Sequence, residues 1–241
     1  MNDATLVIDP RFRGPPQSGN GGYTCGRLAR YLEGPASVRL TAPPPLGKAL
    51  RVEAGDGVAR LWDADTQVAE ARPAAPEVVV PPMPDYDQAV AAARQYTGFH
   101  RHPFPGCFVC GPERSAGDGL HVFAGPLGRD GIVASPWVPG ADLCGDGVVR
   151  TEFVWAALDC PGAFAVMPAE RELAIVLGQL EARIEAPLAA GTRCVVIGWP
   201  IAAEGRKRIV GTAIADAGGR IVARARAVWI IVPAAGFAAA R

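Results

Sequence analysis

The sequence has no excess of charge of either sign and no long apolar run. Lys and Arg together number 24, as do Asp and Glu, so the formal net charge is +0 at pH 7. A balanced chain lacks the basic surface that binds nucleic acid or anionic membranes, so we expect neither partner. No apolar run reaches spanning length without a charge, and the first residues, MNDATLVIDPRFRG, lack the pattern of a secretory signal. We therefore expect a cytoplasmic protein.

Cysteine is scarce as well, with six residues in 241. An even count in a chain of this length does not indicate a disulfide scaffold. Cys160 and Cys194 lie in apolar sequence surroundings, which are typical of small buried thiols.

Histidine is the scarcest of the metal-binding residue types, with three residues. His100 and His102 precede Cys107 and Cys110, and together they resemble an H-x-H and C-x-x-C metal set. The set is incomplete, because a single C-x-x-C without a second pair at ribbon spacing is a weak signal. We predict a thiol-bearing turn and no bound metal, with zinc kept as the alternative.

What the chain does have is apolar content, at 49% of its residues, enough for one large domain or two of ordinary size. The segment 146–166, DGVVRTEFVWAALDCPGAFAV, is apolar nearly all round and predicts a buried helix. Glu152 and Asp159 are seven residues apart in it, so both carboxylates fall on one side. Buried acids are costly unless they are paired, hydrogen-bonded or lining a cavity, which makes both candidates for function.

Two helices have recognisable ends. Asp146 or Thr151 is expected to cap the first turn of the acid-bearing helix, and Pro161-Gly162 is expected to stop or kink it. A second helix near the N-terminus is predicted to start at Ser18 or Asn20 and to end near residue 34.

Glycine is frequent at the start of this N-terminal helix, where it is a poor helix former. Gly21, Gly22 and Gly26 are therefore expected where the backbone closely approaches a packed element or a ligand. The free N–H groups of such a start can hold a carbonyl oxygen or a phosphate. A glycine-rich turn used for packing alone is the alternative.

Extended segments separated by turns make up most of the remainder, with one short helix expected over Asp87–Gln95. The pattern is a helix followed by an antiparallel meander, and it occurs twice. The expected strands are Thr5–Asp9, Ser37–Ala42, Ala49–Ala54, Val58–Trp62, Gln67–Ala71, Leu120–Ala124, Gly131–Trp137, Ile175–Ile184, Thr192–Trp199, Arg208–Ala215 and Arg220–Val232.

An internal repeat supports this double pattern. VRLTAPPPLGKALRV from Val38 aligns with ARIEAPLAAGTRCVV from Ala182, and both copies share one offset (183 − 39 = 144 and 191 − 47 = 144). Two tandem units are a more economical account than one irregular domain. We predict an α+β fold of two units related by a pseudo-twofold axis, with residues 1–84 and a Pro-rich connector in one, and residues 85–241 with a C-terminal tail in the other.

Over about residues 5–232 the sequence resembles the hotdog-fold acyl-CoA thioesterase superfamily in its double-hotdog arrangement. CFVCGPERSAGDGLHVF resembles the C-x-x-C-G…G-L segment of single-hotdog thioesterases of the PaaI type. WAALDC, ending at Cys160, resembles their helix with a catalytic Asp, and Asn20-Gly21-Gly22 resembles the H-G-G or F-G-G that opens the hotdog helix. The resemblance implies sheets wrapped around two central helices.

The sequence departs from the family pattern at three places. The H-G-G position of the second unit reads Arg150-Thr151-Glu152, and the Asp position of the first unit reads Ala29. The Gln that double-hotdog members carry on their last strand falls near Ala227. Neither unit holds the full set, so either the activity is lost or one composite site uses both units.

The resemblance implies hydrolysis of an acyl-CoA or another acyl thioester, without a cofactor, and a homodimer of such chains as a candidate assembly. Asp159 is the first choice for the carboxylate that assists water and Glu152 the second, while Asn20, Gly21 and Gly22 would hold the oxyanion. Basic side chains could meet the CoA phosphates, and the candidates are Arg206, Lys207 and Arg208.

Two other functions stay open. One is a hydratase or dehydratase acting on a thioester, although its Asp and His pair is disfavoured because His100, His102 and His121 lie away from the predicted helices. The other is a non-catalytic protein that binds an acyl group or CoA, which the missing H-G-G and Gln favour. Fold analogy alone does not decide among these functions.

Overall fold

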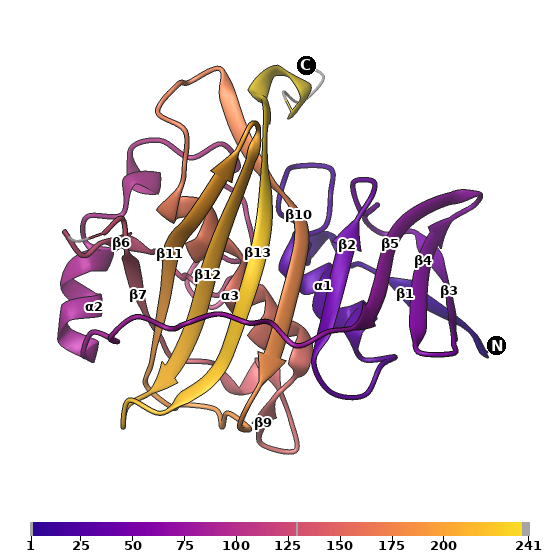
Figure 1. The fold of residues 1–241 in the computed structure, drawn as a ribbon, viewed down its shortest axis with the longest axis horizontal. Coiled ribbons are helices and arrows are strands. Elements are labelled where there is room, and N and C mark those ends of the chain that lie inside the picture. The colour runs from indigo at the N-terminus through magenta and orange to yellow at the C-terminus, as the bar shows by residue number, and fades with distance from the viewer. Residues whose placement is uncertain (1, 129, 238–241) are drawn as a thin grey trace.

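The computed structural model describes residues 2–128 and 130–237, and within them one antiparallel sheet of 11 strands dominates the molecule (Figure 1). The order across the sheet is β1-β3-β4-β5-β2-β10-β13-β12-β11-β7-β6. The α+β fold class is confirmed. The strands are β1 (Asn2–Val7), β2 (Ala36–Leu40), β3 (Ala49–Gly55), β4 (Val58–Asp63), β5 (Thr66–Pro73), β6 (Gly125–Pro126), β7 (Val133–Trp137), β10 (Leu173–Ile184), β11 (Cys194–Glu204), β12 (Lys207–Asp216) and β13 (Ile221–Pro233).

The two halves of the sheet have mirrored strand orders on either side of the contact between β2 and β10. On one side follow β5, β4 and β3, and on the other β13, β12 and β11. At the centre Ser37 pairs with Glu181, which is its counterpart in the internal repeat (181 − 37 = 144). The first 84 residues supply the five strands on one side of this contact, and the later residues supply the six on the other.

Two helices pack against each other on one face of the sheet, namely α1 (Gly21–Ala29) and α3 (Thr151–Ala165) (Figure 1). A Cβ on Gly22 would lie 2.7 Å from the Trp155 carbonyl oxygen, and a Cβ on Gly26 would lie 2.6 Å from the Glu152 Cα. Real Cβ atoms do not approach backbone so closely, so this crossing requires glycine. The expected close approach of backbone at Gly22 and Gly26 is therefore confirmed, and the packed element is α3.

The opposite face of the sheet is covered partly by the chain between β5 and the third helix, α2 (Tyr86–Ala93). This Pro-rich connector runs across the strands of the second half in Figure 1. Val78 and Val80 pack against a cluster that includes Val195 and Ile197 of β11. Side chains alternate between the two faces of a strand, so the intervening Val196 points into the main core on the helix side. Among the described residues, no helix is long and apolar enough to span a bilayer.

Several local expectations from the sequence are wrong, among them the end of α1, which lies at Ala29 and not near residue 34. The segment Leu120–Ala124 is not a strand. Leu120 and Val122 donate N–H bonds to Phe108 and Val109, and the φ of 53° at His121 interrupts any extended run. These hydrogen bonds tie the segment to the loop that carries Cys107 and Cys110, so it cannot pair with the sheet.

The ends of α3 also differ from expectation. Its N-cap is Arg150, without a side-chain capping bond, so neither Asp146 nor Thr151 caps it. The helix does not stop at Pro161-Gly162 but continues to Ala165. Proline removes one helical N–H, and burial of both residues against β11 and β12 offsets that loss. The last part of the predicted tail, residues 238–241, lies outside the described residues.

Candidate active site

The candidate site forms where the first turn of α1 meets the middle of α3. The predicted cap of α1 is confirmed, because the Asn20 side chain accepts a hydrogen bond from the Tyr23 N–H at 2.9 Å. The same amide donates from Nδ2 to Asp159 Oδ2 at 3.0 Å, and the Gly22 N–H donates to that oxygen at 2.9 Å. The structure thus brings together residues that are 139 and 137 positions apart in the sequence.

Asp159 is 1% exposed, and only one of its two oxygens is used in this way. Oδ1 has no hydrogen-bond partner among the described residues. Burial raises the pKa of Asp159 from 3.8 to about 7, although the Gly22 and Asn20 donors act in the opposite direction. The carboxyl group is therefore fixed in position, has one free oxygen, and changes protonation near neutral pH.

The start of α1 has one backbone donor left over. The N–H groups of Gly22, Tyr23 and Thr24 are bonded to Asp159, to the Asn20 side chain and to the Asn20 carbonyl oxygen. The N–H of Gly21, the first helical residue, has no acceptor in the described part of the chain. At a helix N-terminus such a donor carries partial positive charge and can hold a carbonyl oxygen or an oxyanion.

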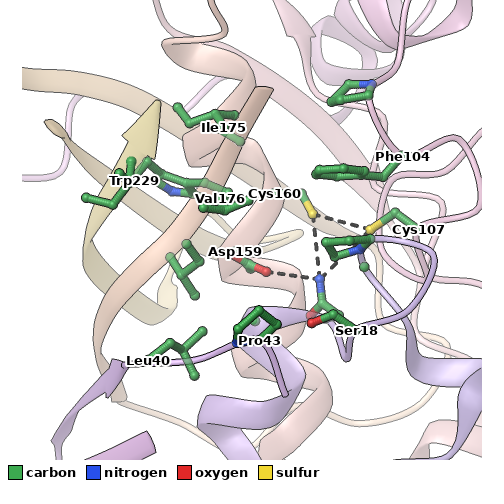
Figure 2. Close-up of a pocket in the computed structure, with 18 of the residues that line it drawn as sticks. Ser18, Leu40, Pro43, Phe104, Cys107, Asp159, Cys160, Ile175, Val176 and Trp229 are labelled. Carbon is green, nitrogen blue, oxygen red and sulfur yellow. Dashed lines mark hydrogen bonds between the residues drawn. The ribbon is translucent and has the colours of Figure 1, made fainter. Parts of the chain in front are cut away.

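An apolar cavity of about 280 Å³ adjoins these groups (Figure 2). Asn20, Gly21 and Asp159 lie in its wall. Apolar side chains from β2, β10, β13, the end of α3 and the loops around them make up much of the remaining wall. They include Leu40, Phe104, Ala163, Phe164, Met167, Ile175, Val176, Leu177, Trp229, Ile230 and Phe237.

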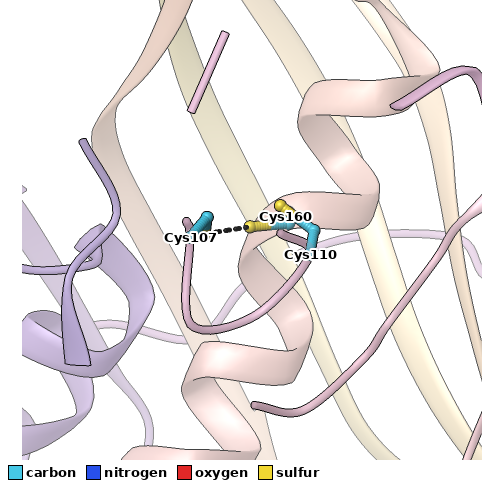
Figure 3. A group of neighbouring side chains, drawn as sticks. All are labelled: Cys107, Cys110 and Cys160. Atoms are coloured by element: carbon cyan, nitrogen blue, oxygen red, sulfur yellow. Dashed lines mark hydrogen bonds between the residues drawn. The ribbon is translucent and has the colours of Figure 1, made fainter. Parts of the chain in front are cut away.

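Three cysteines meet beside Asp159, which the sequence did not predict. The Sγ atoms of Cys107, Cys110 and Cys160 all lie within 4.8 Å of one another (Figure 3). Asn20 Nδ2 lies 3.9 Å from both Cys107 Sγ and Cys160 Sγ, so one amide faces two sulfurs and a carboxylate (Figure 2). Cys160 is buried, as the sequence predicts. Its place in the cluster could not be predicted, because 53 positions separate it from Cys107 and no metal-site spacing rule covers that interval.

The thiols of this cluster lie close enough to shift one another's pKa values. Hydrogen bonds from the Cys110 and Cys160 thiols lower the pKa of Cys107 well below its usual range. The pKa of Cys160 rises for the reciprocal reason, and burial raises the pKa of Cys110. His102 Nε2 lies 3.3 Å from Cys110 Sγ, whereas His100 is exposed at the protein surface.

The other predicted site residues lie elsewhere. Glu152 is in the first turn of α3, and its Oε1 lies 3.6 Å from Arg30 Nη1. It does not line the cavity. The three basic residues fall on the β11–β12 hairpin, where Arg206 and Lys207 are exposed and Arg208 donates to the Gly205 carbonyl oxygen at 2.8 Å. None of the three lines the cavity.

Comparison with known proteins identifies the fold. No family model matches the sequence, and no curated protein matches it. A solved structure provisionally named thioesterase II, from Thermobifida fusca, aligns with 96% of this chain and 93% of its own, at 15% identity and a TM-score of 0.60. The tesB protein of Mycobacterium avium subspecies paratuberculosis aligns with 96% of this chain and 93% of its own, at 12% identity and a TM-score of 0.60.

A third structure, provisionally named as a thioesterase from Novosphingobium aromaticivorans, aligns with 95% of this chain and 94% of its own, at 13% identity and a TM-score of 0.59. The chain therefore has the fold of these thioesterase structures over nearly its full length. The resemblance to hotdog-fold thioesterases is confirmed at the level of the fold, and at such low identity the fold is all that the comparison establishes.

Proposed function

We propose that this protein hydrolyses an acyl thioester, with Asp159 activating the attacking water. One observation carries the proposal. Asp159 is held at Oδ2 by Asn20 and Gly22, has a free Oδ1, and lines an apolar cavity together with Gly21, whose N–H has no acceptor among the described residues. A general base and an oxyanion donor within one cavity are the minimum machinery for hydrolysing a carbonyl compound.

In this mechanism Asp159 must be ionised. Its Oδ1 accepts a proton from a water molecule as the water oxygen attacks the thioester carbonyl carbon. The negative charge that develops on the carbonyl oxygen is stabilised by the Gly21 N–H at the positive end of α1. The carbon–sulfur bond then breaks, the sulfur leaves with a proton returned from Asp159, and the products are a carboxylic acid and a thiol. A pKa of about 7 leaves much of the base ionised at neutral pH.

The apolar wall supports an acyl or aryl group as the part of the substrate that enters the cavity. Leu40, Ile175, Val176 and Trp229 offer it hydrocarbon surface and few polar contacts (Figure 2). Burial of such a group would stabilise binding by roughly 25 cal/mol per Å² of apolar surface. CoA as the thiol, with its phosphates near Arg206, Lys207 and Arg208, stays a prediction, as does assembly into a homodimer.

We also propose that the chain is a double hotdog, with residues 1–84 and 85–241 as its two units. The mirrored strand order and the pairing of Ser37 with its repeat counterpart Glu181 support this reading. The single site would then be composite, with the helix start from the first unit and the acid from the second. The proposal assigns no role to Glu152, because this residue does not line the cavity.

The test is thiol release from a panel of acyl-CoA substrates, measured beside thermal shift with free CoA and with the corresponding acids. Hydrolysis of at least one thioester by the wild type, with loss in Asp159→Asn, is the expected result. A thermal shift without turnover on any member would favour the non-catalytic binder. Addition or loss of water across a carbon–carbon double bond with the thioester intact would favour the hydratase.

A further inference from the structure

We propose that Cys107, Cys110 and Cys160 bind one zinc ion through their sulfur atoms. The proposal does not depend on thioester hydrolysis. It concerns a metal site next to the cavity, formed by two segments of the chain that are remote in sequence.

The separation of two of the sulfurs matches that of a tetrahedral thiolate site, and the third sulfur lies near both. Two sulfurs that are each about 2.3 Å from one zinc ion lie roughly 3.8 Å apart at the tetrahedral angle. Cys107 Sγ and Cys160 Sγ are 3.8 Å apart, and all three sulfurs lie within 4.8 Å of one another. The C-x-x-C turn and α3 point their sulfurs at one place in Figure 3.

A disulfide explains less of this arrangement, because it joins two of the sulfurs and leaves the third without a reason to converge. All three cysteines are buried, with exposures of 3%, 3% and 5%, so none is positioned by contact with solvent. One zinc ion can bind all three sulfurs at once, and cysteine thiolates are ligands that favour zinc.

The surroundings provide donors for metal-bound sulfur. Asn20 Nδ2 faces Cys107 and Cys160 at 3.9 Å. His102 Nδ1 accepts the Phe104 N–H at 2.9 Å, which leaves the proton of a neutral ring on Nε2, 3.3 Å from Cys110 Sγ. Hydrogen bonds of this kind stabilise metal thiolates and orient them. His102 therefore serves as a donor to the Cys110 sulfur, not as the fourth ligand.

The fourth position belongs to a water molecule, because all three cysteines line the cavity. Zinc displaces the remaining thiol protons, which pass to solvent, so its affinity should rise with pH. No change of oxidation state is involved. The ion would also connect the 100–124 loop to α3, and removing it should lower the melting temperature.

The first experiment measures zinc in the full-length protein purified under reducing conditions. About one equivalent per chain is expected, and after chelation the metal-free protein should take up one equivalent of Co²⁺, with the thiolate charge-transfer band and visible d–d bands of a tetrahedral site. Cys107→Ser, Cys110→Ser and Cys160→Ser should each lose this spectrum. Cys25→Ser, at a buried cysteine of α1 outside the cluster, is the matched control and should keep it.

The wild type alone decides the outcome if the serine variants fail to fold. Metal-free wild type that binds neither Zn²⁺ nor Co²⁺ stoichiometrically would overturn the proposal. So would alkylation and mass spectrometry that find two of the three cysteines joined as a disulfide in protein purified without reductant, with no metal present. Retention of the cobalt spectrum in Cys160→Ser would overturn the assignment of the third ligand.

Discussion

Replacing Asp159 with Asn separates the chemistry of the buried acid from its structural contacts. The amide oxygen of Asn can take the place of Oδ2 and accept from Asn20 Nδ2 and from the Gly22 N–H. The amide nitrogen takes the place of Oδ1, which has no partner among the described residues. The variant should therefore fold with the same helix crossing and lose only the ionisable proton.

The stability effect can be worked out from the pKa. The folded-state pKa of about 7 is roughly 3 units above 3.8, and each unit corresponds to about 1.36 kcal/mol. Between these two values the folded protein holds more protons than the unfolded chain, so the free energy of unfolding falls as the pH rises from about 4 to about 7 and then levels off. The ionised acid lowers stability by up to about 4 kcal/mol at pH 8, and Asn removes this loss.

Urea unfolding of wild type and Asp159→Asn at pH 5 and pH 8 measures the effect. The variant should gain stability relative to wild type between the two pH values. Asp65→Asn, at an exposed turn residue, is the control and should follow wild type at both. Thioester hydrolysis should fall by roughly 10²–10⁴-fold in Asp159→Asn, and the wild-type rate should rise with pH through about 7. Equal pH dependence of stability in wild type and variant would refute the reasoning.

Three further substitutions test the surroundings of this acid. Asn20→Ala should lower the free energy of unfolding by about 1 kcal/mol through loss of the cap. It should also reduce kcat for thioester hydrolysis, because Asp159 loses one of its two hydrogen-bond donors. An unchanged kcat in steady-state assays would argue that this hydrogen bond does not position Asp159. Gly26→Ala places a Cβ 2.6 Å from the Glu152 Cα. The urea midpoint should fall by an amount that corresponds to roughly 1–3 kcal/mol of unfolding free energy. A variant as stable as wild type would mean that α1 and α3 are less tightly packed at this crossing. Glu152→Gln should hydrolyse thioesters within about twofold of wild type, since it lies outside the cavity, and a loss comparable to Asp159→Asn would return Glu152 to the site.

Much of the fold follows from local sequence rules. The cap at Asn20 and the bounds of β13 depend on residues near one another, and the sequence predicts both within a few positions. The offset of 144 indicated two similar units, and the central pairing of Ser37 with Glu181 agrees with it. What local rules could not give is the order of strands across the sheet, which depends on long-range pairing.

The errors share a physical cause. A loop hydrogen bond redirected Leu120 and Val122, and burial offset the helix-breaking tendency of Pro161. In each case tertiary contacts outweighed a local preference worth a few kcal/mol or less. The convergence of Cys160 on Cys107 was missed for a related reason, since their proximity depends on how α3 crosses the loop.

In the proposed mechanism the two helices carry complementary halves of one site, and their crossing is consistent with a single site. If the two proposed units are superposed on their helices, Gly22 corresponds to Glu152 and Ala29 to Asp159, since the glycine and acid positions are seven residues apart in both (29 − 22 = 7 and 159 − 152 = 7). At one end of the crossing, glycine admits the α3 backbone and lets the Gly22 N–H reach Asp159.

At the other end of the crossing the same positions are filled differently. Glu152 stands where glycine would, its Oε1 lies 3.6 Å from Arg30 Nη1, and the N-cap residue Arg150 makes no side-chain capping hydrogen bond. An ion pair and an alanine cannot supply a base and an oxyanion donor together. The second end of the crossing is therefore a packing contact, and of the two acids on α3 only Asp159 lines the cavity.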